Sequence, residues 1–419
     1  MKSSVPKVLH KIAGKAMVNH VIDACPGAEI TVVVGPNMPE VEAAVTPHKT
    51  VIQKNQNGTG DAAKSAKDAL ADFDGFVFII NGDLPLIQTE TLENLCHAAQ
   101  ETGLAILGFE ADDPHGYGRL VTSGGHVAEI IEEKDCSDDQ RAITLCNAGA
   151  YCAQGDQLFQ WLDQLSSDNA QGEYYLTDMV AIAAKDNVQC AYAVADELEV
   201  MGVNSRSQLA DAEYVMQARL RAQAMDHGVT MIDPESVYLS TDTIFGQDVT
   251  IEPNVFIGTG VSVRSGTTIH AFSHIEGTVI GENASVGPFA RLRPNSKIGN
   301  DVTVGNFIEV NRSEFKDGSK SKHMSYIGDA VIGEKTNIGA GTVFANYDGF
   351  NKQDTHVGKG VFVGSNSTIV APVTVGDDAI IGAGSTITKD VEADAMAISR
   401  GEEKSIAGKA TDYRKKKSA

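Results

Sequence analysis

The sequence has few cysteines, a single tryptophan and no long hydrophobic run. Its 419 residues include six cysteines, at positions 25, 96, 136, 146, 152 and 190, with no C-x-x-C pair and no histidine at metal-ligand spacing. This usage predicts buried thiols in a reducing compartment rather than disulfides or a metal site. No apolar run reaches the roughly 20 residues that cross a bilayer, and the first residues hold no apolar secretion signal. We expect a cytoplasmic protein without membrane insertion.

Positive charge is also scarce. The chain has 34 lysines and arginines against 56 aspartates and glutamates, which gives a formal net charge of -22. Such a chain repels nucleic acids and anionic membrane surfaces, so we expect neither as a partner. Small phosphorylated substrates remain compatible with it, because local basic clusters can hold them. One basic run lies at residues 413–417, where it is either solvated or in contact with an anionic ligand.

What the sequence does contain is a six-residue repeat. From residue 245 an aliphatic or aromatic residue returns at every sixth position, with three breaks in register, and glycine follows many of these positions: Phe245, Ile251, Ile257, Val263, Ile269, Ile275, Ile280, Val286, Leu292, Ile298, Val304, Val310, Ile332, Ile338, Phe344, Val357, Val363, Ile369, Val375, Ile381 and Ile387. A period of six fits neither a helix nor a simple strand alternation. It predicts short strands joined by tight turns, stacked so that each coil buries the next. We therefore predict a left-handed parallel β-helix.

Two segments interrupt the repeat, 311–328 and 345–356. Insertions in a solenoid leave it as loops, and loops on rigid scaffolds often carry function. His323 lies in the first segment, and an imidazole that titrates near neutrality can take a proton from an amine that attacks a thioester. An isolated loop histidine is more often structural, but this placement favours catalysis. Arg293 offers a fork suited to a sugar phosphate.

Residues 1–205 have a different pattern. Segments 30–35 and 75–83 read as apolar strands of a parallel sheet, with helices expected at 61–71 and 90–101 between and after them. This predicts a Rossmann-like α/β domain, in which ligands bind beyond the carboxyl ends of strands. We expect a helical linker at 206–228, the β-helix at 229–390 and a tail at 391–419.

Asp83 stands at the end of the second predicted strand. A carboxylate there can hold Mg²⁺ beside nucleotide phosphates, although an Asx turn or a helix cap is an equal alternative. Lys7 can place an ammonium near phosphate, and the turn at 57–60 can approach a base, yet an exposed lysine and a surface turn look the same. None of these features assigns a function by itself.

Taken together, the motifs resemble one family over nearly the whole chain: the bacterial bifunctional N-acetylglucosamine-1-phosphate uridylyltransferases and glucosamine-1-phosphate N-acetyltransferases, which make UDP-N-acetylglucosamine. The resemblance rests on segments 6–10, 56–60, 81–86, 116–119, 132–135, 172–178 and 202–204 in the first domain, and on 287–294, 323–330, 337–342, 346–349 and 397–400 in the second.

The resemblance implies roles in the first domain. Asp83 and Asn204 would ligate Mg²⁺ together with the UTP phosphates. The remaining contacts to UTP and N-acetylglucosamine-1-phosphate would come from Lys7, Gln53, Gly58, Thr59, Gly118, Glu132, Asn147 and Asn204. Such a phosphoryl transfer works mainly through positioning and charge neutralisation.

It also implies roles in the β-helix. His323 would be the general base on the amine of glucosamine-1-phosphate. The sugar phosphate would be held by Arg293, Asn311, Tyr326, Asn337 and Lys352, and acetyl-CoA by Ala340, Asn346, Tyr347, Ser365, Ala383 and Arg400. Members of this family are homotrimers whose acetyltransferase sites lie between neighbouring β-helices, so we expect a trimer here.

Two features depart from the family pattern. The family has a strand and a glycine-rich loop, L-x-x-G-x-G-T-x-M, that cradles nucleotide phosphates, and Met1 corresponds to the last residue of that loop. The sequence as written therefore predicts a first domain without this cradle, and the intact remainder favours a start codon assigned too late. The second departure is Asn311, where the family usually has a lysine. We expect weaker sugar-phosphate binding unless Arg312, predicted to face the other side of the strand, or Lys322 compensates.

Two other interpretations stay open at this point. One is an acetyltransferase alone, with a first domain that is inactive without the glycine-rich loop. The other is a nucleotidyltransferase whose β-helix is only structural. The segment 323–326 and the segment around Asn346 and Tyr347 argue against the latter, because a spacer needs neither. A non-enzymatic scaffold is the least favoured of all.

Overall fold

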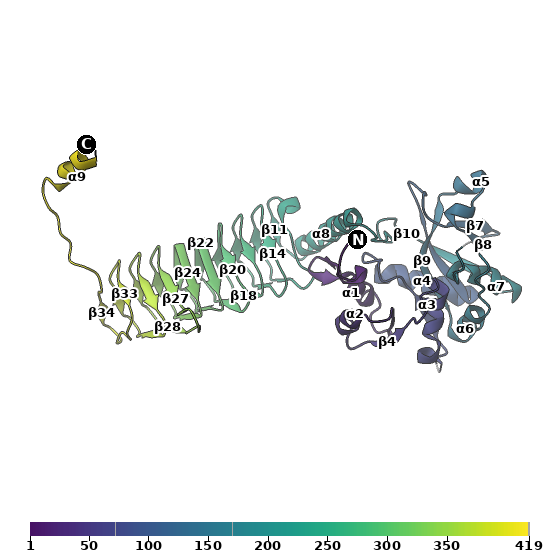
Figure 1. Cartoon of the computed structure of the whole chain (residues 1–419), viewed down its shortest axis with the longest axis horizontal. Coiled ribbons are helices and arrows are strands. Elements are labelled where there is room, and N and C mark those ends of the chain that lie inside the picture. The colour runs from purple at the N-terminus through teal and green to yellow at the C-terminus, as the bar shows by residue number, and fades with distance from the viewer. Residues whose placement is uncertain (72, 170, 418–419) are drawn as a thin grey trace. The chain divides into compact units, whose positions relative to one another are not determined.

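The computed structural model describes residues 1–71, 73–169 and 171–417. The chain divides into two compact units, Met1–Ala218 and Arg219–Ala419. Figure 1 shows an α/β arrangement in the first and a stack of short strands in the second. No helix among the described residues is long and apolar enough to span a membrane.

The first unit contains most of the helices. Its helices are α1 (Met17–Asp23), α2 (Pro39–Ala44), α3 (Thr59–Ser65), α4 (Thr89–Thr102), α5 (Asp138–Arg141), α6 (Gly155–Asp163) and α7 (Met179–Lys185), and α8 (Arg206–Asp226) continues into the second unit, whose C-terminal helix is α9 (Lys409–Lys417). Its strands are β1 (Lys11–Ile12), β2 (Lys15–Ala16), β3 (Thr31–Val34), β4 (Lys49–Ile52), β5 (Phe76–Ile79), β6 (Leu104–Glu110), β7 (Arg119–Ser123), β8 (His126–Ile131), β9 (Leu145–Gln154) and β10 (Cys190–Ala195). The predicted strands at 30–35 and 75–83 correspond to β3 and β5, and the predicted helix at 90–101 to α4. The predicted helix at 61–71 is divided, because α3 ends at Ser65 and a 3-10 helix follows at Lys67–Leu70.

The sheets of this unit are separate. Six strands pair in the order β5-β9-β6-β10-β8-β7, while β3 pairs only with β4, in parallel. The prediction of a parallel sheet is wrong for the larger one, because β9 runs antiparallel between β5 and β6 and only β6 and β10 are parallel. Within the described residues no strand joins β3 to β5. The α/β class itself is confirmed, with one apolar core on each face of the six-stranded sheet.

The second unit is a parallel β-helix. Equivalent residues pair at offsets of one coil, as in the column Ile251, Ile269, Val286 and Val304, whose side chains are all buried. One continuous apolar core runs from coil to coil. The six-residue repeat is therefore confirmed: each repeat supplies one inward-facing residue and one side of the coil.

Its strands are short. They are β11 (Thr230–Met231), β12 (Ile244–Phe245), β13 (Thr250–Ile251), β14 (Phe256–Ile257), β15 (Ser262–Val263), β16 (Thr268–Ile269), β17 (His274–Ile275), β18 (Thr278–Ile280), β19 (Ser285–Val286), β20 (Arg291–Leu292), β21 (Ser296–Ile298), β22 (Thr303–Asn311), β23 (Glu314–Phe315), β24 (Lys320–Gly328), β25 (Ala330–Ile332), β26 (Asn337–Ile338), β27 (Val343–Ala345), β28 (Thr355–Val357), β29 (Phe362–Val363), β30 (Thr368–Val370), β31 (Val373–Val375), β32 (Ile380–Ile381), β33 (Thr386–Ile387) and β34 (Met396–Ala397).

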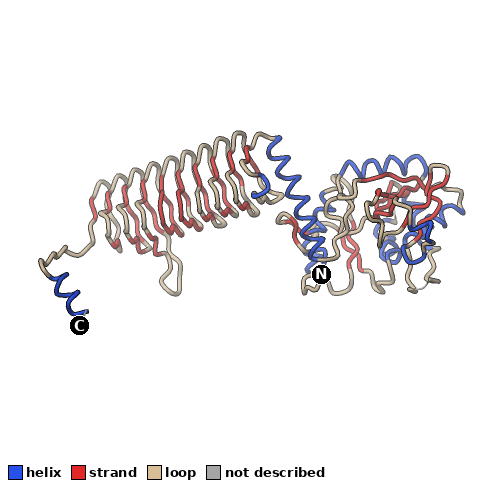
Figure 2. The backbone as a smooth tube through the Cα atoms, turned by 90° about the horizontal axis from the view of Figure 1, so that it is seen from above, coloured by secondary structure: helices blue, strands red, loops and turns tan. Residues whose placement is uncertain are grey.

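The two interruptions of the repeat have different outcomes. The segment 345–356 is a loop, since β27 ends at Ala345 and β28 begins at Thr355, and one loop stands out from the coils in Figure 2. The segment 311–328 is not a loop. It forms a regular coil in which Phe315, Ser321 and Ile327 are buried, and β24 pairs with β22 along most of its length. The prediction of a loop there is wrong, because Ser321 takes an inward position that the aliphatic pattern does not recognise.

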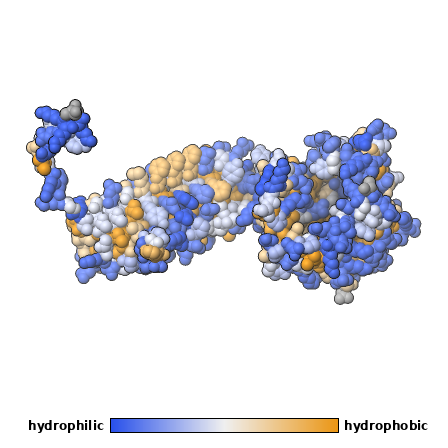
Figure 3. Space-filling model, in the orientation of Figure 1, coloured by the Kyte–Doolittle hydropathy of each residue, from blue (hydrophilic) through white to orange (hydrophobic). Residues whose placement is uncertain are grey.

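One corner of the β-helix carries an exposed apolar column. Phe272, Phe289, Phe307 and Met324 occupy the same corner of successive coils, and all have positive φ, between 41° and 60°. The three rings stack with centroids 4.9 and 5.0 Å apart. Bulky residues rarely adopt this backbone conformation, which small residues accept more easily. Figure 3 shows apolar surface along the β-helix, whereas the first unit is mostly hydrophilic on this face.

Candidate active sites

In the first unit the predicted metal-binding residues converge on one cation. The ammonium of Lys7 lies 2.6 Å from Asp83 Oδ2 and 2.8 Å from Asn204 Oδ1. Lys7 comes from a 3-10 turn, Asp83 follows β5, and Asn204 precedes α8. A carboxylate and an amide oxygen aimed at one point of positive charge form the donor set that Mg²⁺ uses beside phosphates. These residues therefore fit a magnesium ion, with the ammonium able to turn to a phosphate.

The predicted uracil contacts lie around the start of α3. Gln53 Nε2 donates to the carbonyl of Gly58 at 3.0 Å, and Thr59 Oγ1 accepts from the backbone N–H of Leu176 at 3.2 Å. Gly58 has a φ of 100°, and a Cβ there would lie 2.7 Å from the carbonyl of Tyr174. Only glycine fits this close approach, so the conformation of this turn requires the glycine at position 58.

The predicted sugar contacts form a second group in this unit. The backbone N–H of Asn147 donates to the carbonyl of Gly118 at 2.8 Å, which joins β9 to the residue before β7. The carboxylate of Glu132 lies beside Gly118, 3.7 Å from where a Cβ would stand. Burial raises the pKa of Glu132 above its ordinary value, and the negative charges of Asp135 and Asp178 raise it further.

In the β-helix, His323 is exposed on β24 and oriented by a neighbour in the preceding coil. Its Nδ1 lies 2.9 Å from Oδ1 of Asn306, its partner in the strand register. When the amide oxygen of Asn306 accepts from Nδ1–H, the lone pair of the ring lies on Nε2, on the side away from Asn306. An imidazole in this tautomer can accept a proton at Nε2.

The predicted acetyl-CoA residues extend from His323 along the stack. The N–H of Gly341 donates to the carbonyl of Met324 at 2.9 Å and also lies 3.4 Å from that of His323. In the next coils the carbonyl of Ala340 accepts from Asn366, and that of Ser365 accepts from Gly384. The carbonyl of Ala383 accepts from the guanidinium of Arg400 at 2.9 Å. His323, Ala340, Ser365 and Ala383 thus lie in one line, one residue to each coil, although they are far apart in sequence.

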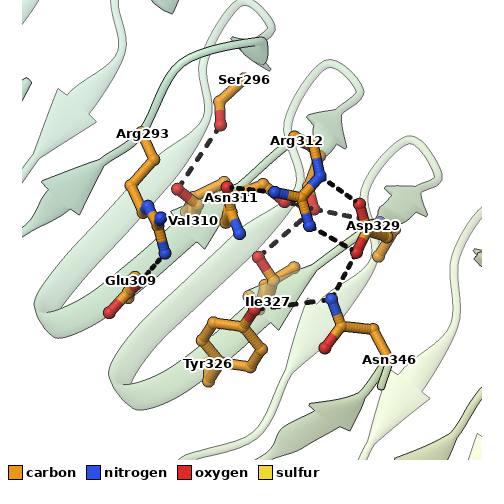
Figure 4. A network of polar contacts seen from close by, with 12 residues as sticks. Arg293, Ser296, Glu309, Val310, Asn311, Arg312, Tyr326, Ile327, Asp329 and Asn346 are labelled. Carbon is orange, nitrogen blue, oxygen red and sulfur yellow. Dashed lines mark hydrogen bonds and ion pairs between the residues drawn. The ribbon is translucent and has the colours of Figure 1, made fainter. Parts of the chain in front are cut away.

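The predicted sugar-phosphate residues other than Asn337 lie past the Met324 corner. Arg293 pairs with Glu309 at 2.9 Å, and its coil stacks on that of Asn311 (Figure 4). The hydroxyl of Tyr326 lies 3.5 Å from Nδ2 of Asn346, over Gly328, where a Cβ would be only 2.5 Å from that hydroxyl. Glycine at this position lets the two side chains meet.

The loop 346–354 brings the last predicted residues to this group. Tyr347 and Lys352 form an isolated antiparallel bridge across it, and Tyr347 Oη donates to the carbonyl of Gly349 at 2.6 Å. Lys352 acts electrostatically on Asp329. Asn337, on β26, pairs with Lys320 of the preceding coil and lies apart from this loop in the strand register.

Both units of the chain match known protein families. Residues 1–173 match the MobA-like NTP transferase domain family, and residues 277–307 and 354–389 match the bacterial transferase hexapeptide family. The chain is 45% identical to the bifunctional protein GlmU of Paramagnetospirillum magneticum over 425 aligned positions, which cover 100% of this chain and 95% of that protein. It is 51% identical to that of Gluconobacter oxydans over 377 positions, which cover 89% and 84%. The chain belongs to the bifunctional GlmU family.

Membership in the GlmU family confirms the predicted fold and enzyme class. The chain is a bifunctional transferase, with a uridylyltransferase domain followed by a left-handed parallel β-helix that is an acetyltransferase. Among solved structures, a CMP:2-keto-3-deoxy-manno-octonic acid synthetase complexed with CTP covers 52% of this chain and 95% of its own, at 19% identity and a TM-score of 0.41.

Sequence reasoning missed several residues at these sites. Asn306 orients His323, Glu309 pairs with Arg293, and Asp329 contacts Asn346. Asp61 accepts from Gln53 at 2.9 Å in the first unit. Counting one coil back from His323 would have found Asn306, because the register pairs residues 17 apart at this point. The same count leads from Tyr326 to Glu309, and from Arg312 to Asp329, whereas Asp61 had no signal in the sequence.

Proposed function

We propose that the β-helix transfers the acetyl group of acetyl-CoA to the amine of glucosamine-1-phosphate. The amine nitrogen attacks the thioester carbonyl while Nε2 of His323 takes the proton; the C–S bond then breaks, and the departing thiolate receives that proton. The observation that carries this proposal is the Asn306–His323 hydrogen bond of 2.9 Å, which leaves Nε2 as the proton acceptor.

The two substrates would approach this imidazole from opposite sides of the corner. Acetyl-CoA would lie along the line of Ala340, Ser365 and Ala383, where successive coils expose backbone groups at a regular spacing. Its remaining contacts would be Asn346, Tyr347 and Arg400. The sugar phosphate would lie past Met324, among the polar side chains of Arg293, Asn311, Tyr326 and Lys352. Asn337, on the His323 side of the corner, would contact the sugar from there.

For the first unit we propose uridylyl transfer from UTP to N-acetylglucosamine-1-phosphate with release of pyrophosphate. Asp83 and Asn204 would hold Mg²⁺, which neutralises charge on the phosphates when bound. Lys7 would turn from these two residues to a phosphate oxygen. Gln53, Gly58 and Thr59 would face the uracil, and Gly118, Glu132 and Asn147 the amino sugar. Their clustering, pair by pair, supports this proposal.

We further propose that the β-helix assembles as a homotrimer through the corner column Phe272, Phe289, Phe307 and Met324. Their exposed fractions are 54, 45, 57 and 61%. The rings repeat every 4.9 to 5.0 Å along the stack. A partner surface that covers them should therefore carry apolar groups with the same spacing. A second copy of this β-helix, side by side and parallel, has that period. The corner lies between His323 and Tyr326, so a neighbour placed there would border the acetyltransferase site.

A single preparation of the chain tests these proposals. Acetyl transfer to glucosamine-1-phosphate is followed by thiol release, and uridylyl transfer by pyrophosphate release with Mg²⁺. We expect thiol release that depends on His323, from a trimer by light scattering. Thiol release without pyrophosphate release would leave the chain as an acetyltransferase alone. Absence of both would reject the assignment of substrates.

A further inference from the structure

Arg312 lies where the sequence predicted it would not. It follows β22 with a φ of 50°, which turns its side chain back beside Asn311 instead of to the opposite face of the strand. Nη1 of its guanidinium donates to Oδ1 of Asn311 at 3.1 Å. Nε and Nη2 donate to the two carboxylate oxygens of Asp329, at 2.6 and 2.8 Å (Figure 4). The prediction for Arg312 is wrong because the strand, with its alternation of faces, ends at Asn311.

These bonds use three of the five N–H groups of the guanidinium. Among the described residues the other two have no protein partner, and the Arg312 side chain is 31% exposed, against 10% for Asp329. The carboxylate is therefore covered while the guanidinium still reaches solvent. The charge of Lys352 also lowers the pKa of Asp329, so a second cation lies near this carboxylate. The group carries a net positive charge in a chain whose formal net charge is -22.

We propose that Arg312 binds the phosphate of glucosamine-1-phosphate, in the place that the lysine of the family pattern would take at position 311. This rests on the acetyltransferase reaction proposed above. A planar guanidinium with two free N–H groups suits a phosphate, because it can donate two parallel hydrogen bonds to it. Asn311 then serves as the acceptor that fixes the guanidinium, and its loss of charge relative to lysine is offset by the neighbouring arginine.

Asp329 acts as a positioning residue for both substrates. One carboxylate oxygen accepts from Arg312 and from Asn346, and Nδ2 of Asn346 also lies 3.5 Å from the hydroxyl of Tyr326. Arg312 and Asp329 occupy equivalent corners of successive coils, as the backbone bond from Asp329 to the carbonyl of Asn311 shows. Asp329 thus links the sugar-phosphate residues to one of the residues assigned to acetyl-CoA.

The test compares two acceptors, glucosamine-1-phosphate and glucosamine, in the acetyl transfer assay of the full chain. Arg312→Gln should raise the KM for glucosamine-1-phosphate by about ten- to a hundredfold, the range expected for loss of a charge-assisted hydrogen bond. The KM for acetyl-CoA and the rate on glucosamine, which has no phosphate, should stay within about twofold. Asp329→Asn should raise the KM for both glucosamine-1-phosphate and acetyl-CoA.

Matched variants separate recognition from folding. Lys322→Gln removes an exposed cation that lies on the other side of the Met324 corner, and it should leave all three constants unchanged. Asn311→Lys alone should change the KM by less than about threefold, because the phosphate already has its cation and the two bonds to Asp329 still hold Arg312. Added to Arg312→Gln, it should recover most of the lost affinity. A variant that merely misfolds would not regain affinity when a second cation is placed at position 311.

Three outcomes would overturn the inference: an unchanged KM in Arg312→Gln, an equal loss on glucosamine, or the expected loss in Lys322→Gln instead. If the unmodified chain does not acetylate glucosamine-1-phosphate at all, the proposed function fails before Arg312 is tested. If it does, and Arg312→Gln behaves like the unmodified chain, only the role of Arg312 fails. The two failures are therefore distinguishable.

Discussion

The two units of this chain bury their strands in different ways. In the β-helix each coil lies on the one before it, so most strands have their neighbour 17 or 18 residues away, as in the pairing of Ile251 with Ile269 and of Ile269 with Val286. Across the loop 346–354 the distance is 25 residues, as between Asn337 and Phe362. In the first unit, β5 pairs with β9 across more than seventy residues of chain. Stability in the first case is a sum of similar neighbour terms, and in the second it depends on a few distant pairings.

The difference teaches where a missing element matters. A coil of the β-helix that lacked one aliphatic residue still formed, since Ser321 is buried in the column without breaking the pairing of β22 and β24. The first unit has three separate sheets among the described residues, and β3 and β5 each pair on one side only. In such sheets the loss of one strand pairing removes a large part of the stabilisation, whereas in the stacked coils the neighbouring pairings remain.

The largest expected effect tests whether acetyl transfer belongs to the β-helix alone. His323→Ala should lower acetyl transfer by about 100- to 10,000-fold, because the attacking amine loses its proton acceptor. Uridylyl transfer should not change. His356→Ala is the control, since His356 is another exposed histidine of the same β-helix, on β28. Equal losses in the two variants, measured by thiol release, would reject the role of His323.

The second prediction is the converse for the first unit. Asp83→Asn should lower uridylyl transfer by about 100-fold or more and raise the Mg²⁺ concentration needed for half activity, because the substitution removes the charge that holds the cation. Acetyl transfer should stay as it is. Asp68→Asn, at an exposed position of the same unit, is the matched variant. A pyrophosphate assay with an unaltered Mg²⁺ dependence would contradict this assignment.

The third prediction asks whether the units unfold separately. Ile269→Ala should destabilise the β-helix by about 2–5 kcal/mol, and Ile269→Val by about 0.5–1.5 kcal/mol, since the side chain is fully buried. In urea, the midpoint for the loss of acetyl transfer should move to a lower concentration, while the midpoint for the loss of uridylyl transfer should not change. A parallel shift of both transitions would show that the two units unfold as one.

The smallest effect concerns pH. The pKa of Glu132 is raised by burial and by Asp135 and Asp178. Its carboxylate therefore takes up a proton at a higher pH than that of an ordinary glutamate, whose pKa is about 4.3. As the pH falls through this raised pKa, the group stops accepting two hydrogen bonds from the sugar, and the KM for N-acetylglucosamine-1-phosphate should rise several-fold.

Steady-state assays of uridylyl transfer across that range check this sign. Glu132→Gln should show a KM that is high at every pH and does not change with it. Glu129→Gln, at an exposed position of β8, should keep the profile of the unmodified chain. A flat profile in the unmodified chain would mean that Glu132 does not contact the sugar.

Much of this architecture could be predicted from the sequence. The inward residue of each coil is fixed by a local rule, one aliphatic side chain in six, so the β-helix and its second interruption followed from the pattern. The α/β class followed from two apolar strands and the helices after them. The arrangement of the larger sheet did not, because β9 inserts antiparallel between strands that are its neighbours only in the fold.

The residues themselves determined the repeat, the acidic surface and the candidate polar side chains, since these depend on composition and on spacing within one coil. The tertiary structure alone decided which of them meet. Asn306 reaches His323, and Asp329 holds Arg312, only because coils stack in a register of 17 residues at these points. Arg312 turns toward Asn311 because the strand ends there and its backbone enters the left-handed region, a conformation that no spacing of residue types specifies.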